Sequence, residues 1–403
     1  MRPLDGIRVL DFSRVLSGPY CGRALADLGA DVVKVEPPAG DLTRFAHPRR
    51  NSMSYYYAQQ NAGKRNVSLD LRRPEATNLL LRLAARTDVL LENFRPGVMA
   101  RMGLGPAAVM AANPRLVYAS ISGYGQEGPW SDRRAYAVVI HAEMGLTHSQ
   151  LEHRGEESRR VNDPLSHADV YAGLECTAGI LAALLQRERT GAGQHLDVSM
   201  AASLLSVNER VQYELSGIDT GPEPPALSPG GSPVFDTAEG HLVTVAGDPV
   251  SSANFGLFCD VMGRPELRAD PRFAGIEARA RHRDDLLAIV QGWVLGFDDL
   301  DELETALARV RLPMGVVRSV AEVAASAWAS HHGAIAEVSD RGDGVIRIPQ
   351  APWRFSGAEV GVGAEPAYRG EHNREVFAEV GVTEGALDHL EAEGVLSSRV
   401  PVR

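Results

Sequence analysis

The chain has 403 residues, of which 44% are hydrophobic and 23% charged, a balance typical of globular proteins that suffices for two domains or for one large domain with an insertion. Its formal net charge of −11 argues against bulk attraction to nucleic acid or to an anionic membrane, so we expect neither as a partner. The three cysteines are far apart and form neither a disulfide framework nor a metal-binding pattern. Because the start lacks an apolar signal core and no apolar run reaches about 18 residues, we expect a cytoplasmic protein.

Apolar strands alternate with helical stretches over the first half of the chain. Buried strands are predicted over residues 6–12, 31–36, 64–71, 89–94, 115–125 and 195–200. Helices are predicted over residues 19–28, 74–88 and 169–189, with another that starts near 201. This alternation predicts an α/β fold with a parallel sheet.

The composition changes after residue 216. Residues 217–233 are rich in Gly, Pro and Ser and read as a linker. A strand over 241–247 and amphipathic helices over 284–297 and 299–310 predict a separate, smaller domain that ends near residue 330. The tail contains a short strand over 344–349 and a last helix over 373–381. We therefore divide the chain into residues 1–222, 223–330 and 331–403.

The first strand, turn and helix resemble the start of a dinucleotide-binding domain, with Glu36 at the position of a ribose-binding acid. The turn "DFSRVLSGPYCG" (11–22) contains Gly18 and Gly22 but lacks the GxGxxG spacing that lets a backbone approach a pyrophosphate. Pro19 also removes one of the N–H donors that would bind the phosphate. The sequence of this turn therefore favours a structural role for the first βα unit and argues against NAD binding.

Seven blocks in order resemble the class III CoA-transferase family, which contains formyl-CoA transferase, carnitine CoA-transferase and α-methylacyl-CoA racemase. The blocks cover nearly the whole chain and read "GIRVLDFSRVLSGPYCGRALADLGADVVKVEPPAGDLTR", "NAGKRNVSLDL", "DVLLENFRPGVMARMGLG", "NPRLVYASISGYGQEGPW", "DPLSHADVYAGLECTAGILAALLQRERTGAGQHLDVSM", "GRPELRADPRFA" and "RGEHNREVFAEVG".

This resemblance implies a large Rossmann-like domain with a parallel sheet, built from both chain ends, and a smaller inserted α+β domain. It also implies an interlocked homodimer. The implied reaction transfers CoA from an acyl-CoA to a free carboxylic acid, so CoA and acyl-CoA are substrates, and neither a permanently bound cofactor nor a metal is expected.

The nucleophile that the resemblance implies is Asp169, whose carboxylate would form covalent acyl and CoA intermediates. The local sequence has a structural interpretation as well. Ser166 and Asp169 stand three residues apart before an apolar helix, which is the spacing of a capping box. The two roles are compatible, because a helix start favours an ionised carboxylate.

CoA carries phosphates, so its binding requires cations and donors at the loops that follow the strands. The resemblance assigns this role to residues of three motifs: Asn61, Lys64, Asn93, Phe94, Arg95, Arg101, Arg134, Ala135 and Tyr136. Without the resemblance, each Lys or Arg of this set would be interpreted as a solvated charge on the protein surface. Pro37 follows Glu36 where formyl-CoA transferase has an arginine, so one adenine contact is missing or is supplied by another residue.

The segment around Tyr136 distinguishes transfer from racemisation. The racemase branch has a catalytic histidine where this chain has Tyr136, whereas Arg134 to Tyr136 match the "KAY" of formyl-CoA transferase. His141 and His167 lie nearby and keep an acyl-CoA racemase or epimerase as the alternative. A CoA-binding protein without catalysis, or an NAD-binding Rossmann-type protein, is the more distant alternative.

The resemblance assigns four residues to the substrate loops: Leu16, Ser17, Gly230 and Gly231. Leu16 replaces a glutamine that touches the substrate of formyl-CoA transferase, which favours a larger or more apolar acyl group than formyl or oxalyl. Gly230 and Gly231 align with a mobile glycine-rich loop, or they form an ordinary turn.

Overall fold

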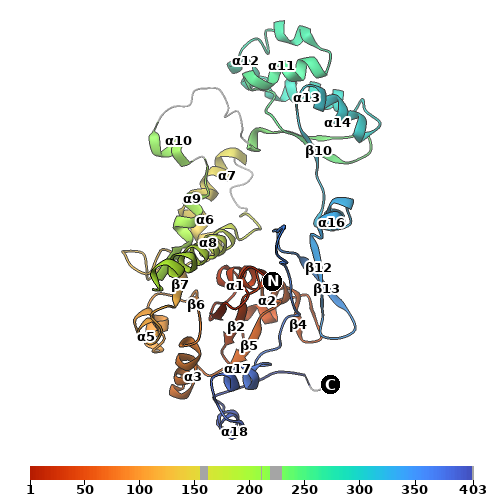
Figure 1. Cartoon of the computed structure of the whole chain (residues 1–403). Helices are drawn as coiled ribbons and strands as arrows, with labels where there is room; N and C mark the ends of the chain where they lie inside the picture. Colours follow the sequence, from red (N-terminus) through yellow and green to blue (C-terminus); the bar gives the residue numbers. More distant parts are fainter. Residues whose placement is uncertain (155–161, 210, 218–228, 402–403) are drawn as a thin grey trace. The chain divides into compact units, whose positions relative to one another are not determined.

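The computed structural model describes residues 1–154, 162–209, 211–217 and 229–401 (Figure 1). It divides into two compact units, Met1–Asn208 with Ala327–Arg403, and Glu209–Ser326. The unit boundaries therefore fall at 208/209 and 326/327, where we expected 222/223 and 330/331. Most of the predicted linker, residues 218–228, lies outside the described residues.

The first unit contains a six-stranded parallel sheet, which confirms the predicted α/β class. Its strand order is β5-β2-β1-β6-β7-β8. The strands are β1 (Arg8–Asp11), β2 (Asp31–Glu36), β5 (Arg65–Ser68), β6 (Val89–Glu92), β7 (Val117–Ser122) and β8 (His195–Ser199). All six coincide with predicted strands.

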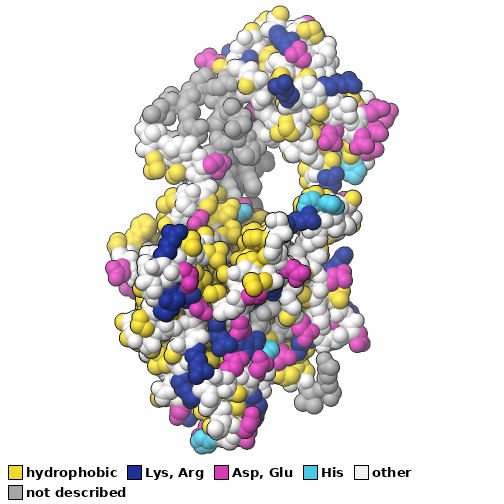
Figure 2. All heavy atoms as spheres, viewed as in Figure 1, with side chains coloured by type: hydrophobic (Ala, Val, Ile, Leu, Met, Phe, Trp, Pro, Cys, Tyr) yellow, Lys and Arg dark blue, Asp and Glu magenta, His cyan; other side chains and the backbone are white. Residues whose placement is uncertain are grey.

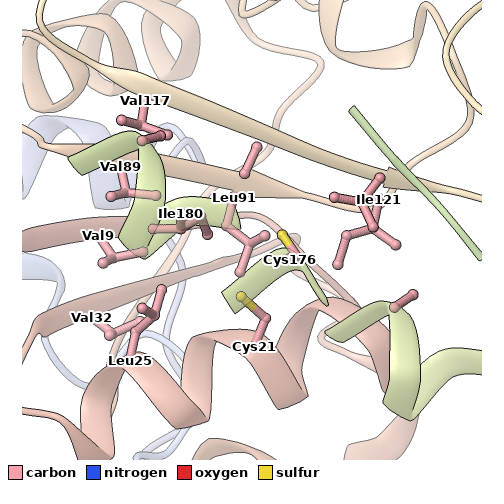
Figure 3. Close-up of a cluster of buried hydrophobic side chains, with 14 of the residues drawn as sticks. Val9, Cys21, Leu25, Val32, Val89, Leu91, Val117, Ile121, Cys176 and Ile180 are labelled. Atoms are coloured by element: carbon pink, nitrogen blue, oxygen red, sulfur yellow. The ribbon is translucent and has the colours of Figure 1, made fainter. Parts of the chain in front are cut away.

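Helices lie on both faces of this sheet. They are α1 (Ser17–Asp27), α2 (Tyr55–Asn61), α3 (Pro74–Ala84), α4 (Val98–Arg101), α5 (Pro106–Ala112), α6 (Ala137–Glu143), α7 (Leu146–Arg154), α8 (His167–Thr190) and α9 (Met200–Ser206). Alternate residues of each strand point to opposite faces, so Val9 packs with α1 and α8 while Leu10 packs with α3. Figure 3 shows the first of these cores, in which Cys21 of α1 and Cys176 of α8 lie close together.

Helix α8 is, by length and composition alone, the one helix of the described residues that could span a membrane. In this structure it packs against α1, α9, β7 and β8, and its residues Ala172, Cys176 and Ile180 are fully buried. Its apolar composition is therefore that of a helix in a protein core.

The end of the chain returns to the first unit. It contributes α16 (Ala327–His332), a hairpin of β12 (Ile335–Ser339) and β13 (Val345–Pro349), α17 (Asn373–Glu379) and α18 (Glu384–Ala392). Helix α17 packs on β5, and Leu396 forms a bridge with Leu69. The prediction that 373–381 is the last helix was wrong, because α18 follows it. A short hairpin, β3 (Arg49–Arg50) and β4 (Met53–Ser54), interrupts the predicted loop.

The second unit has its own core, around Val243, Phe258 and Val290. A three-stranded antiparallel sheet has the order β11 (Met314–Val316), β10 (Leu242–Val245), β9 (Val234–Asp236). The helices are α10 (Val211–Ser216), α11 (Ser252–Val261), α12 (Ile276–Arg281), α13 (Arg283–Val294), α14 (Leu300–Arg309) and α15 (Val320–Ala324). The predicted strand and the two predicted helices correspond to β10, α13 and α14.

Candidate active site at the carboxyl edge of the sheet

A cavity of about 290 Å³ opens in the first unit where β1, β6 and β7 end. Such an edge is where open α/β sheets bind ligands. Its lining residues come from the end of β7, from the segments after β1, β2, β6 and β7, and from the starts of α1, α8 and α9: Arg14, Val15, Ser17, Leu42, Asn93, Phe94, Arg95, Pro96, Ile121, Ser122, Gly123, Ser131, Arg133, Arg134, Ala135, Tyr136, Asp169 and Met200.

Asp169 stands in the first turn of α8, and it is the one carboxylate among the described residues that line the cavity. Burial raises the pKa of this carboxyl to about 6, while hydrogen bonds from the backbone amide and the hydroxyl of Ser17 lower it. At neutral pH the group is therefore mainly ionised. It is also less solvated than a surface carboxylate, which makes it suitable as a nucleophile.

Asn93, at the end of β6, holds the loop that carries Ser17. Its Oδ1 accepts from the amide of Arg14 at 2.7 Å, and its Nδ2 donates to the carbonyl of Arg14 at 2.8 Å. The same Nδ2 donates to Ser17 Oγ at 3.0 Å, so this hydroxyl can direct its own proton to Asp169. The amide of Asn93 thereby fixes both the loop and the donor that faces the carboxylate.

The loop between β1 and α1 has an unusual backbone. Val15 has φ of 66°, which is strained for a β-branched residue. Its amide donates to the carboxylate of Asp41 at 3.2 Å, and Lys34 Nζ donates to the carbonyl of Ser13 at 2.7 Å. At Gly18 a Cβ would lie 2.1 Å from Ser13 Cβ, so only glycine lets α1 start this close to the loop. Buried polar contacts therefore maintain the strain beside Asp169.

The start of α8 is capped by His141. The amide of Ala168 donates to His141 Nε2 at 3.1 Å, and burial followed by the nearby His167 lowers the pKa of His141. The neutral imidazole thus accepts a hydrogen bond at the helix terminus. Our expectation of a capping box was wrong. Ser166 is the N-cap residue, yet its side chain makes no capping hydrogen bond. The side chain that accepts from an amide of the first turn is instead that of His141, which is far from Ser166 in the sequence.

Several arginines line the same cavity as Asp169. Arg14, Arg95 and Arg134 line the cavity without an ion pair to any carboxylate of the described residues, and Arg14 Nε is buried without a hydrogen-bond partner there. Arg133 is different, because it pairs with Glu143 and its guanidinium lies 4.9 Å from the ring centroid of Trp130. The lining of the cavity therefore combines one carboxylate with several guanidinium groups, which are groups that suit anionic ligands.

Eight of the predicted residues line this cavity: Asp169, Ser17, Asn93, Phe94, Arg95, Arg134, Tyr136 and Ala135. Gly123 makes room for the last of these, because a Cβ there would lie 2.4 Å from Ala135 Cβ. Sequence reasoning missed Arg14 and Tyr56, whose phenol has its pKa raised by burial and then by the charge of Asp169. No local pattern marks either residue as part of a site.

The structure does not support Lys64 and Asn61 as phosphate ligands. Lys64 is 3% exposed, and its ammonium donates to Asp11 Oδ2 at 2.9 Å, the Pro19 carbonyl at 2.9 Å and Asn61 Oδ1 at 3.0 Å. All three donors of Lys64 are used. The ion pair of Lys64 and Asp11 packs against α1 at Gly22, where a Cβ would lie 2.6 Å from Asp11 Oδ2. These contacts indicate that Lys64 stabilises the packing of α1.

The other predicted residues lie elsewhere. Arg101 lines a separate cavity of the first unit together with Arg72 and Arg73. Leu16 is buried and is absent from the lining of the Asp169 cavity, which leaves its predicted contact with the acyl group without support. Gly230 and Gly231 belong to the second unit, where they end a short 3-10 turn, Pro229–Gly231.

Comparison with known proteins identifies the family of this chain. Residues 4–373 match CoA-transferase family III. The chain is 33% identical to succinyl-CoA–D-citramalate CoA-transferase of Chloroflexus aurantiacus, covering 98% of each chain, and 31% identical to succinyl-CoA:glutarate CoA-transferase of Mus musculus, covering 98% of this chain and 91% of the relative. The crystal structure of a CAIB/BAIF family protein from Brucella suis superposes with a TM-score of 0.78 at 32% identity, covering 94% of this chain and 99% of that one. The chain belongs to CoA-transferase family III and is an enzyme that transfers CoA between an acyl-CoA and a carboxylic acid.

Proposed function

We propose that Asp169 transfers CoA through covalent intermediates formed on its side chain. The observation that carries this proposal is the position of its carboxylate: it lies in a cavity, partly desolvated, and is oriented by two donors of Ser17. A carboxylate that is ionised, desolvated and held in one orientation is prepared for attack on a thioester carbonyl.

The proposed reaction has two symmetrical halves. Asp169 attacks the donor thioester, which gives a mixed anhydride and CoA thiolate. The thiolate attacks the aspartyl carbonyl, which gives an aspartyl-CoA thioester and releases the donor acid. The acceptor carboxylate attacks this thioester, and the thiolate then takes the acceptor acyl group and regenerates Asp169. Charge and atoms balance without a redox cofactor or metal.

The loop 93–103 is proposed to hold CoA. Asn93 to Pro96 line the Asp169 cavity, whereas Arg101 to Gly103 line the cavity that contains Arg72 and Arg73. A CoA molecule along this loop would place its thioester at Asp169 and its nucleotide phosphates near Arg101. Because guanidinium groups suit phosphate oxygens, Arg95 and Arg101 are the proposed phosphate ligands.

Arg14 is proposed to bind a carboxylate of the acyl donor or acceptor. Its Nε is buried at the cavity, without a partner among the described residues, and an unpaired buried donor is costly until an anion fills the site. The two named relatives use succinyl-CoA with a second dicarboxylic acid. We therefore propose a dicarboxylic acid as the substrate class.

Racemisation is less well supported. His141 Nε2 accepts the amide of Ala168, and His167 lies 3.4 Å from Asp163, so both histidines have partners outside the cavity lining. Tyr136 occupies the position of the racemase histidine and is 68% exposed.

The remaining expectations are proposals too. Helices α6, α8 and α9 expose Val138, Leu174, Leu185 and Leu205, apolar surface that a second copy of the chain would cover in a homodimer. The protein is proposed to work in the cytoplasm, and Gly230 with Gly231 to cover the aspartyl intermediates.

One incubation in heavy water tests the proposed function. The protein is mixed with succinyl-CoA and other acyl-CoAs and with a pool of mono- and dicarboxylic acids, and the thioesters are identified by mass spectrometry. We expect new thioesters of dicarboxylic acids. Deuterium in the acyl-CoA without any new thioester would instead establish racemisation.

A further inference from the structure

A second group of cations lies in the first unit, in a cavity of about 320 Å³ that shares no lining residue with the Asp169 cavity. We call it the arginine pocket. Its described lining contains four arginines and no carboxylate: Arg44, Arg49, Arg369 and Arg399, with Ala39, Phe45, Ser52, Tyr368, Val400 and Pro401. On the face of this unit that Figure 2 shows, basic and acidic side chains are interspersed.

One of the four charges is already neutralised. Arg44 donates to both carboxylate oxygens of Glu36 at 2.8 Å, and its guanidinium lies 3.8 Å from the ring centroid of Tyr57. Glu36 also accepts from the amide of Asp41 and the side chain of Asn66. The carboxylate of Glu36 thus pairs directly with Arg44, and among the described residues it forms no ion pair with the other three arginines.

Arg369 is buried without a counterion among the described residues. It is 7% exposed, and its Nη1 donates to Ser68 Oγ at 2.9 Å and to Ser397 Oγ at 2.6 Å. Burial, followed by the charge of Arg399, lowers the pKa of Arg369. The charge of Glu36 favours the guanidinium of Arg369, but Glu36 is already paired with Arg44, so an anion in the pocket would stabilise the buried charge further.

Arg399 and Arg49 complete the group at the mouth of the pocket. The amide of Arg399 donates to the carbonyl of Arg369 at 2.8 Å, which keeps the two arginines next to each other. The guanidinium of Arg49 lies 5.8 Å from the ring centroid of Phe45. Both side chains are exposed, and neither pairs with a carboxylate of the described residues.

We propose that the arginine pocket binds the phosphate group of a small molecule. Three guanidinium groups without an ion pair among the described residues match a phosphate dianion better than a single carboxylate, since each presents a planar pair of donors. The volume exceeds that of a bare ion and admits an attached organic group. This site is additional to the Asp169 cavity and stands without the proposed transfer mechanism.

Calorimetric titration of inorganic phosphate at constant ionic strength tests the site. The double variant Arg49→Gln with Arg399→Gln removes two exposed cations and leaves the buried contacts of Arg369 intact. We expect its Kd for phosphate to rise by about tenfold or more. Arg318→Gln, an exposed arginine of the second unit, is the matched control and should leave Kd unchanged. Equal binding by the wild type and the double variant, or no binding by either, would overturn the proposal.

The source of the phosphate is identified by titrating CoA and dephospho-CoA, which lacks the 3′-phosphate; this arm alone rests on the proposed function. If the double variant binds CoA more weakly but dephospho-CoA equally, the pocket takes the 3′-phosphate of CoA. If the double variant binds CoA and dephospho-CoA as tightly as the wild type does but no longer binds inorganic phosphate, the pocket takes a separate phosphorylated ligand.

Discussion

Replacing Ser17 by alanine tests how the carboxylate of Asp169 is kept ionised. The variant loses the hydroxyl donor to Asp169 and keeps the backbone amide of residue 17. A hydrogen bond to a charged group contributes about 1.5 kcal/mol or more, so its loss should raise the pKa of Asp169 by about one unit, from about 6 toward 7. At pH 7 the ionised fraction would fall from about nine-tenths to about one-half.

The assay is the pH dependence of kcat/KM for transfer from succinyl-CoA, measured between pH 5 and 9. The acidic limb should move upward by about one pH unit in Ser17→Ala, and part of the activity lost at pH 6 should return at pH 8.5. Ser122→Ala is the matched control, because Ser122 lines the cavity and its hydroxyl accepts from the amide of Gly125. A loss of activity in Ser17→Ala that is the same at every pH would refute this reasoning.

Three further predictions concern other residues. Burial raises the pKa of Glu92 to about 7, so this carboxyl binds a proton in the native state more strongly than when unfolded, and wild-type stability falls as the pH rises from about 4.5 through about 7. The free energy of unfolding of Glu92→Gln should not show this decrease, which is at most about 3 kcal/mol in the wild type. The melting temperature of the variant minus that of the wild type should therefore increase between pH 5 and 8, and a difference that is the same at both pH values would contradict the prediction. Lys64→Met leaves Asp11 buried without its cation and should destabilise the protein by about 3–5 kcal/mol in denaturant titrations, while the KM for succinyl-CoA stays within about twofold; a large rise in that KM would restore Lys64 as a ligand. Arg14→Gln removes the proposed partner of the non-reacting carboxylate, so it should raise the KM for a dicarboxylic acceptor by about tenfold and leave the KM for a monocarboxylic acid unchanged. Equal rises for both acids would contradict a contact with the non-reacting carboxylate.

The strands of the first unit were predictable because each is a short apolar run between turns. Strand β2 agrees with its prediction at both ends, and β1 lies within the predicted segment. Helix α2 was missed, since its tyrosines and glutamines lack a clear apolar stripe.

Contacts between distant segments explain what the sequence could not show. Lys64 follows a loop as a phosphate ligand would, but its ammonium meets Asp11, which is 53 residues away in the chain. Ser166 has the spacing of a cap, but His141 comes from another helix and takes its place. The arginine pocket joins residues 39–52 to residues 368–401, which no local pattern connects.

Covalent labelling of Asp169 tests the central claim most directly. The protein is incubated with succinyl-CoA without an acceptor, treated with hydroxylamine and digested, and the peptide that contains Asp169 is analysed by mass spectrometry. An activated aspartyl group should be converted to a hydroxamate at Asp169, and Asp169→Asn should show neither this modification nor CoA transfer. Transfer by the wild type with Asp169 unmodified, or transfer by Asp169→Asn at the wild-type rate, would contradict the account.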